Sequence, residues 1–336
     1  MKRGKYLFFA VIVGFFLISG GSCGKKEKQL TICFSFQDLE TEFWVGAHKA
    51  ITEELKARGV RVIERNSSQD ANRQLEQVRD AIAQQVDGII IIPQDGQSAN
   101  TIIGEANRAG IPIAVFNRPP ADSSRNAIVV LADNKLIAEK AVDYMVEKAA
   151  ASGRRYRPCI IVGDLGDPNS IARRDGFYAA LAKRPQLFKP VVEVPSKWDA
   201  GTTLANFEAA IQANPDIDFV FTSSDFLYPQ LRSVLEPLGK WTSDADPRHV
   251  ILGGVDGDSF ACRMMRERII DATGVQDLFF EARSLMDELL RAIDNGEKQP
   301  KKWIVDPGFT LTLDNYAERA VDMWGCVLLH RGLISR

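Results

Sequence analysis

The sequence has few of the residue types that build metal sites and nucleophilic sites. It contains 3 histidines and 5 cysteines in 336 residues. The histidines are scattered without metal-ligand spacing and no CxxC pair occurs, so a zinc site is not expected. The G-x-S-x-G, H-E-x-x-H and Walker motifs are also missing, and "VGDLGD" lacks the G-x-G-x-x-G spacing. These absences weigh against the common hydrolase, metalloprotease and nucleotide-binding classes, and we expect no cofactor.

An excess of charge of one sign is missing as well. Lys and Arg number 42 and Asp and Glu number 44, which gives a formal net charge of −2, and no basic block occurs. Nucleic acid is therefore not an expected partner. The chain of 336 residues, 45% of them hydrophobic, exceeds the usual size of a single core, so we expect two domains.

The first 23 residues have the layout of a secretory signal. Basic residues come first, an apolar run follows over 6–18, and small residues come next. The run is too short for a comfortable membrane span. Cys23 follows "GGS", which resembles the lipobox of bacterial lipoproteins, although Gly20 stands where that motif usually has Leu. We expect residues 1–23 to be a signal peptide that ends at a lipidated Cys23; ordinary cleavage and a retained anchor are the alternatives.

Export permits disulfides, yet the other cysteines give mixed signals. Cys33 and Cys159 lie inside strand-like runs, where a buried thiol acts as a small hydrophobe. Cys262 and Cys326 fall in helical patterns, and the sequence does not decide whether they pair.

Strand and helix patterns alternate along the chain. The first series has strands at 30–36, 60–66, 87–94 and 111–117, separated by helical patterns of three- and four-residue apolar spacing. A second series begins near 127 and runs through a strand that ends at 256. No Gly- or Ser-rich linker separates the two series, and the tail 301–330 suggests an irregular segment followed by an amphipathic helix. This alternation predicts an α/β protein of two doubly wound, Rossmann-like lobes joined by a narrow hinge.

Polar side chains gather where these strands end. Parallel strands bring their ligands to their carboxyl ends, so such residues are binding candidates, although each one alone is more often a cap or turn. The candidates are Asn117, Arg118, Asp167, Asn169, Arg173, Ser224, Asp256 and Gln276.

Aromatic residues accompany them. Phe43 and Trp44 follow the first strand, and Trp198 follows a strand of the second series. Carboxylate, amide and guanidinium groups hydrogen-bond to hydroxyls, while aromatic rings cover the C–H faces of a pyranose. The combination therefore points to a sugar.

Taken in order, the motifs resemble one family over essentially everything after residue 28. The segments "TEFW", "GIIIIPQD", "IPIAVFNRP", "LADN", "ARRDGF", "WDAGTT", "TSSD", "GGVDGD" and "ATGVQD" follow the pattern of the periplasmic sugar-binding proteins of type I fold. That family, the ribose and galactose/glucose group, supplies ABC importers.

The resemblance implies roles for individual residues. Phe43 and Trp198 match stacking aromatics, and Trp44 matches a second aromatic of the ribose branch. Arg173 and Asp256 match sugar-binding residues, and Gln276 matches a glutamine of the ribose branch. Asn117 and Arg118 replace an Asp-Arg or Asn-Lys pair, and Asp167 and Asn169 replace a His and an Asp.

Other positions depart from the family pattern. Thr41 stands where the branches carry Asn or Asp, and Ser224 stands where they carry Asn. Asp38, Glu40 or Glu42 could compensate from the same loop. The calcium loop of the glucose/galactose branch has no counterpart, so no metal is expected. Asn117 and Trp198 favour a hexose over ribose.

The resemblance implies a mechanism in which two lobes close on a monosaccharide and present it to an ABC permease of the inner membrane. The expected lobes are 28–134 with 277–313 and 135–276 with 314–336, with hinge strands near Asn134, Gln276 and Leu313. We expect a monomer on the periplasmic or cell-surface side of the cytoplasmic membrane, attached to it through Cys23 if that residue is lipidated.

Three other functions fit parts of the sequence. A glycosidase could use Asp167 and Asp256 as its carboxyl pair, but Arg173 nearby would keep carboxylates ionised, which suits a general acid poorly. A sugar-responsive repressor needs a helix-turn-helix where this chain has an export signal. A receptor subunit for chemotaxis or for a sensor kinase remains the main alternative.

Overall fold

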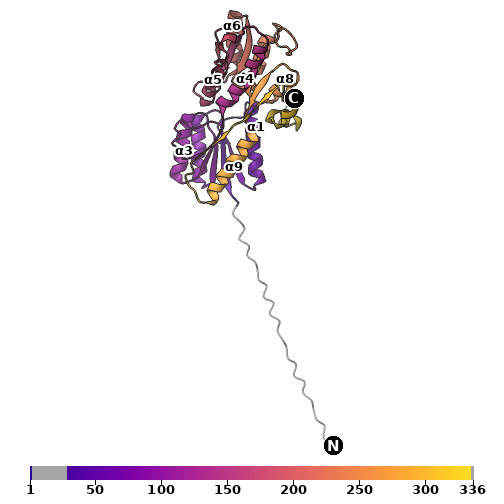
Figure 1. Cartoon of the computed structure of the whole chain (residues 1–336). Helices are drawn as coiled ribbons and strands as arrows, with labels where there is room; N and C mark the ends of the chain where they lie inside the picture. The colour runs from indigo at the N-terminus through magenta and orange to yellow at the C-terminus, as the bar shows by residue number, and fades with distance from the viewer. Residues whose placement is uncertain (2–28, 334–336) are drawn as a thin grey trace.

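A computed structural model describes Met1 and residues 29–333 of the chain. The predicted lipidation site Cys23 lies outside the described residues, as do all residues of the predicted signal peptide except Met1. The described chain forms two α/β lobes, one above the other in Figure 1, and each lobe is built on a six-stranded sheet. The predicted fold class is confirmed.

The first lobe contains residues from both ends of the sequence. Its sheet has the order β2 (Arg61–Asn66), β1 (Thr31–Phe36), β3 (Gly88–Ile92), β4 (Ile113–Phe116), β5 (Ile128–Ala132) and β11 (Lys302–Asp306), and all its neighbours are parallel. The sheet packs with α1 (Glu42–Ala57), α2 (Ala71–Ala83), α3 (Gly96–Ala109) and α9 (Leu278–Asp294).

The second lobe repeats this plan. Its sheet has the order β7 (Val192–Pro195), β6 (Arg157–Val162), β8 (Ile217–Thr222), β9 (Ile251–Asp256), β10 (Ala272–Val275) and β12 (Phe309–Thr312). Only β12 is antiparallel to its neighbour. Its helices are α4 (Asn134–Ala151), α5 (Pro168–Leu181), α6 (Ala200–Ala213), α7 (Tyr228–Leu235), α8 (Ser259–Arg266), α10 (Tyr316–Arg319) and α11 (Trp324–His330).

The central strands are apolar because helices cover both faces of each sheet. All five residues of β3 are buried, and β1 is buried from its second residue onward. Several helices begin at an aspartate whose carboxylate accepts backbone N–H bonds, for example Asp95 before α3 and Asp167 before α5. Asp95 follows β3 and Asp167 follows β6, so both of these caps lie at the carboxyl ends of strands.

The tail departs from the sequence-based prediction. Residues 302–306 and 309–312 form β11 and β12 rather than an irregular segment. Both strands are short and partly exposed, so neither has the continuous apolar run that identified the others. Because β12 pairs with β10, the last boundary between the lobes lies at Pro307 and Gly308 instead of 313. A Cβ at Gly308 would lie 2.4 Å from the Val275 carbonyl oxygen, so this turn requires glycine.

The chain crosses between the lobes three times among the described residues, after β5, after β10 and after β11. Asp306 joins these crossings. Its carboxylate accepts hydrogen bonds from the backbone N–H groups of Asp277, at 2.7 Å, and Gly308, at 2.9 Å. Its carbonyl oxygen accepts one from Asp133 at 2.8 Å. One residue therefore ties all three hinge segments together.

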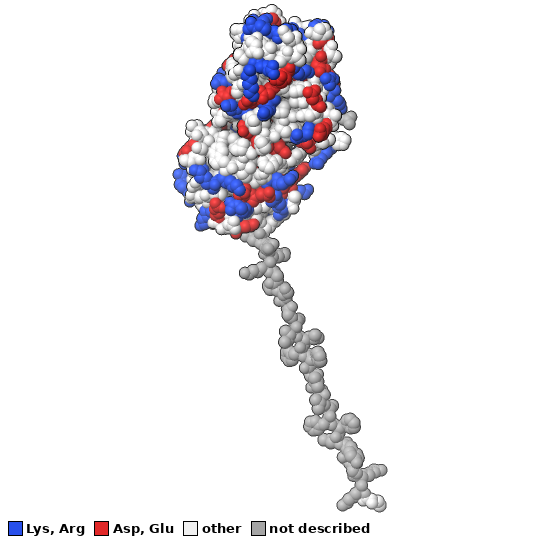
Figure 2. Space-filling view, in the orientation of Figure 1, with Lys and Arg blue, Asp and Glu red and all other residues white. Residues whose placement is uncertain are grey.

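Three further features concern the cysteines, the surface charge and the length of the apolar helices. Cys262 and Cys326 form a disulfide that joins α8 to α11, whereas Cys33 and Cys159 are free and buried. Figure 2 shows Lys and Arg mixed with Asp and Glu over the visible face of both lobes, without a continuous basic area. Within residues 29–333, no helix is long and apolar enough to cross a membrane.

The lobes also touch away from the hinge. Glu42, in the first turn of α1, accepts hydrogen bonds at 2.7 Å from the backbone N–H and the hydroxyl of Ser259 in α8. Asp258, the residue before Ser259, caps α8 and is buried beside Glu42. Burial, and then the negative charge of Glu42, raise the pKa of the Asp258 carboxyl to about 7, while Arg263 opposes this shift.

This contact predicts a pH dependence. The pKa of Asp258 is higher in the folded chain than in the unfolded chain, so folding takes up a proton and the free energy of unfolding falls as pH rises from 5 to 7. The expected contribution is up to about 1 kcal/mol per pH unit. Chemical denaturation of Asp258→Asn, which keeps the cap, should give a smaller decline than wild type.

The control is Asp199→Asn, which changes the exposed residue that caps α6. Hydrogen bonds to Thr202 lower the pKa of the Asp199 carboxyl, so it stays ionised between pH 5 and 7. In this variant the free energy of unfolding should fall between pH 5 and 7 as steeply as in wild type. An equally steep fall in wild type and in Asp258→Asn would contradict the prediction.

Candidate functional site

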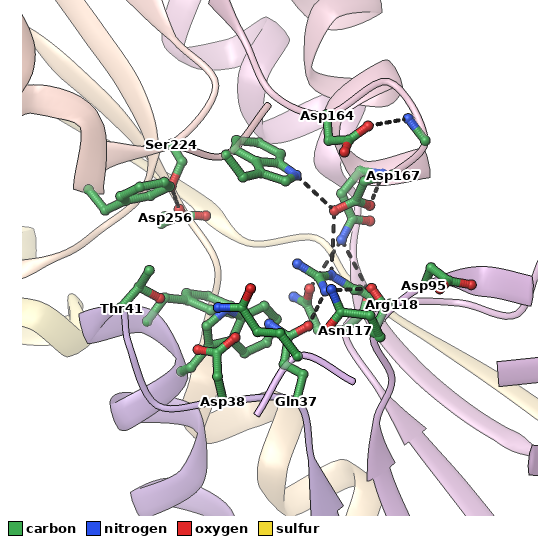
Figure 3. Close-up of a pocket in the computed structure, with 18 of the residues that line it drawn as sticks. Gln37, Asp38, Thr41, Asp95, Asn117, Arg118, Asp164, Asp167, Ser224 and Asp256 are labelled. Carbon is green, nitrogen blue, oxygen red and sulfur yellow. Dashed lines mark hydrogen bonds and ion pairs between the residues drawn. The ribbon is translucent and has the colours of Figure 1, made fainter. Parts of the chain in front are cut away.

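A cavity of about 410 Å³ lies between the lobes, at the carboxyl ends of both sheets. It is lined by all twelve candidate ligand-binding residues that the sequence singled out: Thr41, Phe43, Trp44, Asn117, Arg118, Asp167, Asn169, Arg173, Trp198, Ser224, Asp256 and Gln276. Figure 3 shows Ser224 and Asp167 of the second lobe across the cavity from Thr41 and Asp38 of the first. Residues far apart in the sequence are thus gathered at one place.

Asp256 is a buried carboxylate of this cavity with three side-chain partners. Its Oδ1 is 2.9 Å from Nη2 of Arg173 and accepts a hydrogen bond from Nε2 of Gln276 at 2.7 Å, and its Oδ2 accepts one from the Ser224 hydroxyl. Burial raises the pKa of Asp256, and the positive charge of Arg173 opposes that shift. Because breaking one side of a buried ion pair costs several kcal/mol, Arg173 and Asp256 depend on each other.

These groups belong to a closed ring of hydrogen bonds. Arg173 Nε donates to Asn134 Oδ1 at 2.7 Å, and Asn134 donates to Asn169 Oδ1 at 3.0 Å. Asn169 donates to Asn117 Oδ1 at 3.1 Å, and Asn117 donates to Gln276 Oε1 at 2.9 Å. Gln276 donates to Asp256, which pairs with Arg173 and closes the ring.

The ring links both lobes through the hinge. Asn117 follows β4 of the first lobe, whereas Asn134 and Gln276 stand at two of the crossings. Each amide donates with its nitrogen and accepts with its oxygen, so an aspartate at position 117 could not donate to Gln276. This explains why an amide suits position 117.

A second link joins the lobes above this ring. The Arg118 guanidinium lies 3.5 Å from Asp167 Oδ2 and also donates to the Gln94 carbonyl at 2.8 Å and to the Gln37 side chain. The same carboxylate oxygen of Asp167 accepts from the Trp198 indole N–H at 3.3 Å. Burial lowers the pKa of Arg118, and Asp167 opposes that shift. Asp167 therefore caps α5 and orients two residues of the cavity.

Aromatic rings reach the cavity from both lobes. Phe43 and Trp44, at the start of α1, meet edge to face with ring centroids 4.8 Å apart, and Arg118 lies 5.1 Å from the Trp44 ring. Trp198 lies over Gly163, where any Cβ would come within 2.2 Å of the indole. A glycine at the end of β6 is thus a requirement of the Trp198 position.

Sequence reasoning missed several residues of the cavity. The lining residues that it did not single out are Gln37, Gln69, Gln94, Asp95, Gly96, Asp164, Gly166, Pro168, Lys197 and Phe226. Gln69 follows β2, and Gln94 and Asp95 follow β3, so the rule of strand ends would have found them if applied to those two strands. Asp38 and Glu40 line the cavity as the sequence suggested, whereas Glu42 instead bonds Ser259.

The cavity carries more acidic than basic side chains. Asp38, Glu40, Asp95, Asp164, Asp167 and Asp256 line it, against Arg118, Arg173 and Lys197. Both arginines are engaged by Asp167 and Asp256. Asp38 is 7% exposed and burial raises the pKa of its carboxyl. The remaining acceptors suit hydroxyl donors and disfavour an anion.

Known proteins resemble the chain in sequence and structure. A family model described as the periplasmic binding protein domain matches residues 32–298. The ribose import binding protein of Bacillus subtilis is 27% identical over 251 residues, covering 75% of this chain and 77% of that protein. The D-allose-binding periplasmic protein of Escherichia coli is 27% identical over 284 residues, covering 81% and 86%.

Solved structures agree with the fold. An ABC transporter solute binding protein of Bacillus halodurans with bound myo-inositol superimposes with a TM-score of 0.74 at 26% identity, covering 86% of this chain and 96% of that one. A galactofuranose binding protein gives a TM-score of 0.77 at 21% identity, covering 88% and 99%.

The resemblance expected from the motifs is thereby confirmed. The family is made up of substrate-binding proteins and not of enzymes, which removes the glycosidase alternative. The chain belongs to the periplasmic binding protein domain family, with the type I architecture of the sugar-binding proteins that serve ABC importers.

Proposed function

We propose that this protein captures a neutral monosaccharide or similar polyol, with a hexose as the first candidate, and delivers it to an ABC permease. The observation that carries the proposal is the cavity itself, with a hydrogen-bonded polar floor and aromatic side chains from both lobes. Relatives named for ribose and D-allose and a structural neighbour with myo-inositol support a polyhydroxylated ligand.

The geometry supports capture by closure. Phe43 and Trp44 come from the first lobe and Trp198 from the second, so a sugar between them contacts both lobes only when they are together. The binding energy then favours the closed state, which a permease can distinguish from the open state. No chemical step is needed, because the ligand is carried and released unchanged.

A thermal-shift screen tests the ligand class. Neutral hexoses, pentoses and inositols should include at least one compound that stabilises the protein by about 2.7 kcal/mol at a hundred times its dissociation constant. Uronic acids and sugar phosphates should give no shift, because acidic groups outnumber basic ones in the cavity. A response to nucleosides or amino acids alone would assign the cavity to another ligand class.

Trp198→Ala tests the aromatic contact of the second lobe. Loss of the indole should weaken binding of the sugar found in the screen about tenfold, measured by isothermal titration calorimetry. The control is Trp303→Ala on β11, which removes an indole that is 38% exposed and lies outside the cavity. Unchanged affinity in Trp198→Ala would show that this ring does not contact the ligand.

Export and lipid anchoring also remain proposals. They are supported by the layout of residues 1–23 and by the Cys262–Cys326 disulfide, which is typical of proteins in oxidising compartments. Cells fed labelled palmitate should incorporate label into the wild-type chain and not into Cys23→Ala. Equal labelling of both chains would contradict lipidation at Cys23.

A further inference from the structure

Trp324 of α11 is fully enclosed at the boundary between the lobes, although it does not line the cavity. Its side chain is 1% exposed, and its indole Nε1–H donates a 2.7 Å hydrogen bond to the main-chain carbonyl of Asp256. Its ring meets the Phe43 ring edge to face, with centroids 6.0 Å apart. One side chain thus touches a cavity residue of each lobe.

The backbone at Asp256 needs such support. Asp256 has a φ of +122°, a value that residues other than glycine rarely adopt and that persists only where the surroundings enforce it. The Trp324 bond holds the carbonyl of this residue, and the following N–H, of Gly257, donates to Asp225 Oδ2 at 2.8 Å. These two bonds fix both sides of the peptide group that directs the Asp256 carboxylate into the ring of hydrogen bonds.

The short helix α11 is itself held in place by three contacts. The Gly325 N–H donates to the Gly257 carbonyl at 3.1 Å, and a Cβ at Gly325 would lie 2.3 Å from the main chain of Asp258. Cys326 is bonded to Cys262 of α8. The disulfide therefore fastens the segment that carries Trp324 to the lobe that carries Asp256.

We propose that Trp324 is a positioning residue of the ligand site, which orients Asp256 through its indole N–H and supports Phe43 through its ring, and that the Cys262–Cys326 disulfide keeps it there. This inference rests on the proposed function. It extends the site to α11, whose residues, all of them described, do not line the cavity.

The test is a double-mutant cycle on ligand affinity. Trp324→Phe keeps an aromatic ring beside Phe43 and removes the N–H donor. It should weaken binding of the sugar identified in the screen about tenfold, which corresponds to the loss of one buried hydrogen bond. When Asp256 is already replaced by Asn, Trp324→Phe should weaken binding by less than about twofold. The reason is that the indole N–H of Trp324 acts on the ligand through Asp256. Trp303→Phe, on the exposed strand β11, is the matched control and should bind like wild type.

A second variant covers the case in which Trp324→Phe does not fold. Cys262→Ser combined with Cys326→Ser leaves Trp324 unchanged and releases α11, and it should also lower affinity in the wild-type background more than in Asp256→Asn. Unchanged affinity in these variants, or an equal loss in both backgrounds, would overturn the inference while the proposed function stands. If no sugar binds the wild-type protein, the proposed function fails, and the positioning role falls with it.

Discussion

The site depends on the buried ion pair between Arg173 and Asp256. Taking two charges out of water is costly, and the pair is tolerated because both partners are also hydrogen-bonded. Arg173 donates to the Ser223 carbonyl, and Asp256 accepts from the Ser224 hydroxyl and the Gln276 amide. The chain of donors that leaves Arg173 returns to Asp256 through three asparagines and a glutamine. Linked bonds of this kind polarise one another in a low dielectric, so the ring acts as a unit. The residues of this ring come from both lobes and from the hinge, so the ring fixes how the two sides of the cavity face each other.

Much of this arrangement could be predicted from the sequence, because parallel strands impose a simple rule. A strand buried on both faces is visible as an apolar run, and its carboxyl end must face the ligand crevice. This rule places Asn117, Asp256 and Gln276 at the crevice, and all three line the cavity. The rule failed where strands are short and exposed, as in β11 and β12, since these lack the pattern that defines an end.

Pairing between distant residues could not be read from the sequence. Glu42 has the same chemistry as Glu40 and lies two residues away, yet the helical turn directs it to Ser259 of the other lobe instead of the cavity. Cys262 and Cys326 are separated by 64 positions, and only the packing of α11 on α8 brings them together. Asn134 was expected at the hinge, but its bonds to Arg173 and Asn169 emerge only from the folded topology.

Asp306 gives the molecule a mechanical property. Independent connections between two bodies would allow them to slide, twist and tilt in several combinations. Here the side-chain carboxylate and the main-chain carbonyl of Asp306 accept hydrogen bonds from all three connections. Sliding one connection past another would break at least one of these three bonds, so Asp306 opposes relative displacement of the three segments at this point. The parts of the two lobes next to the hinge are thereby kept in register.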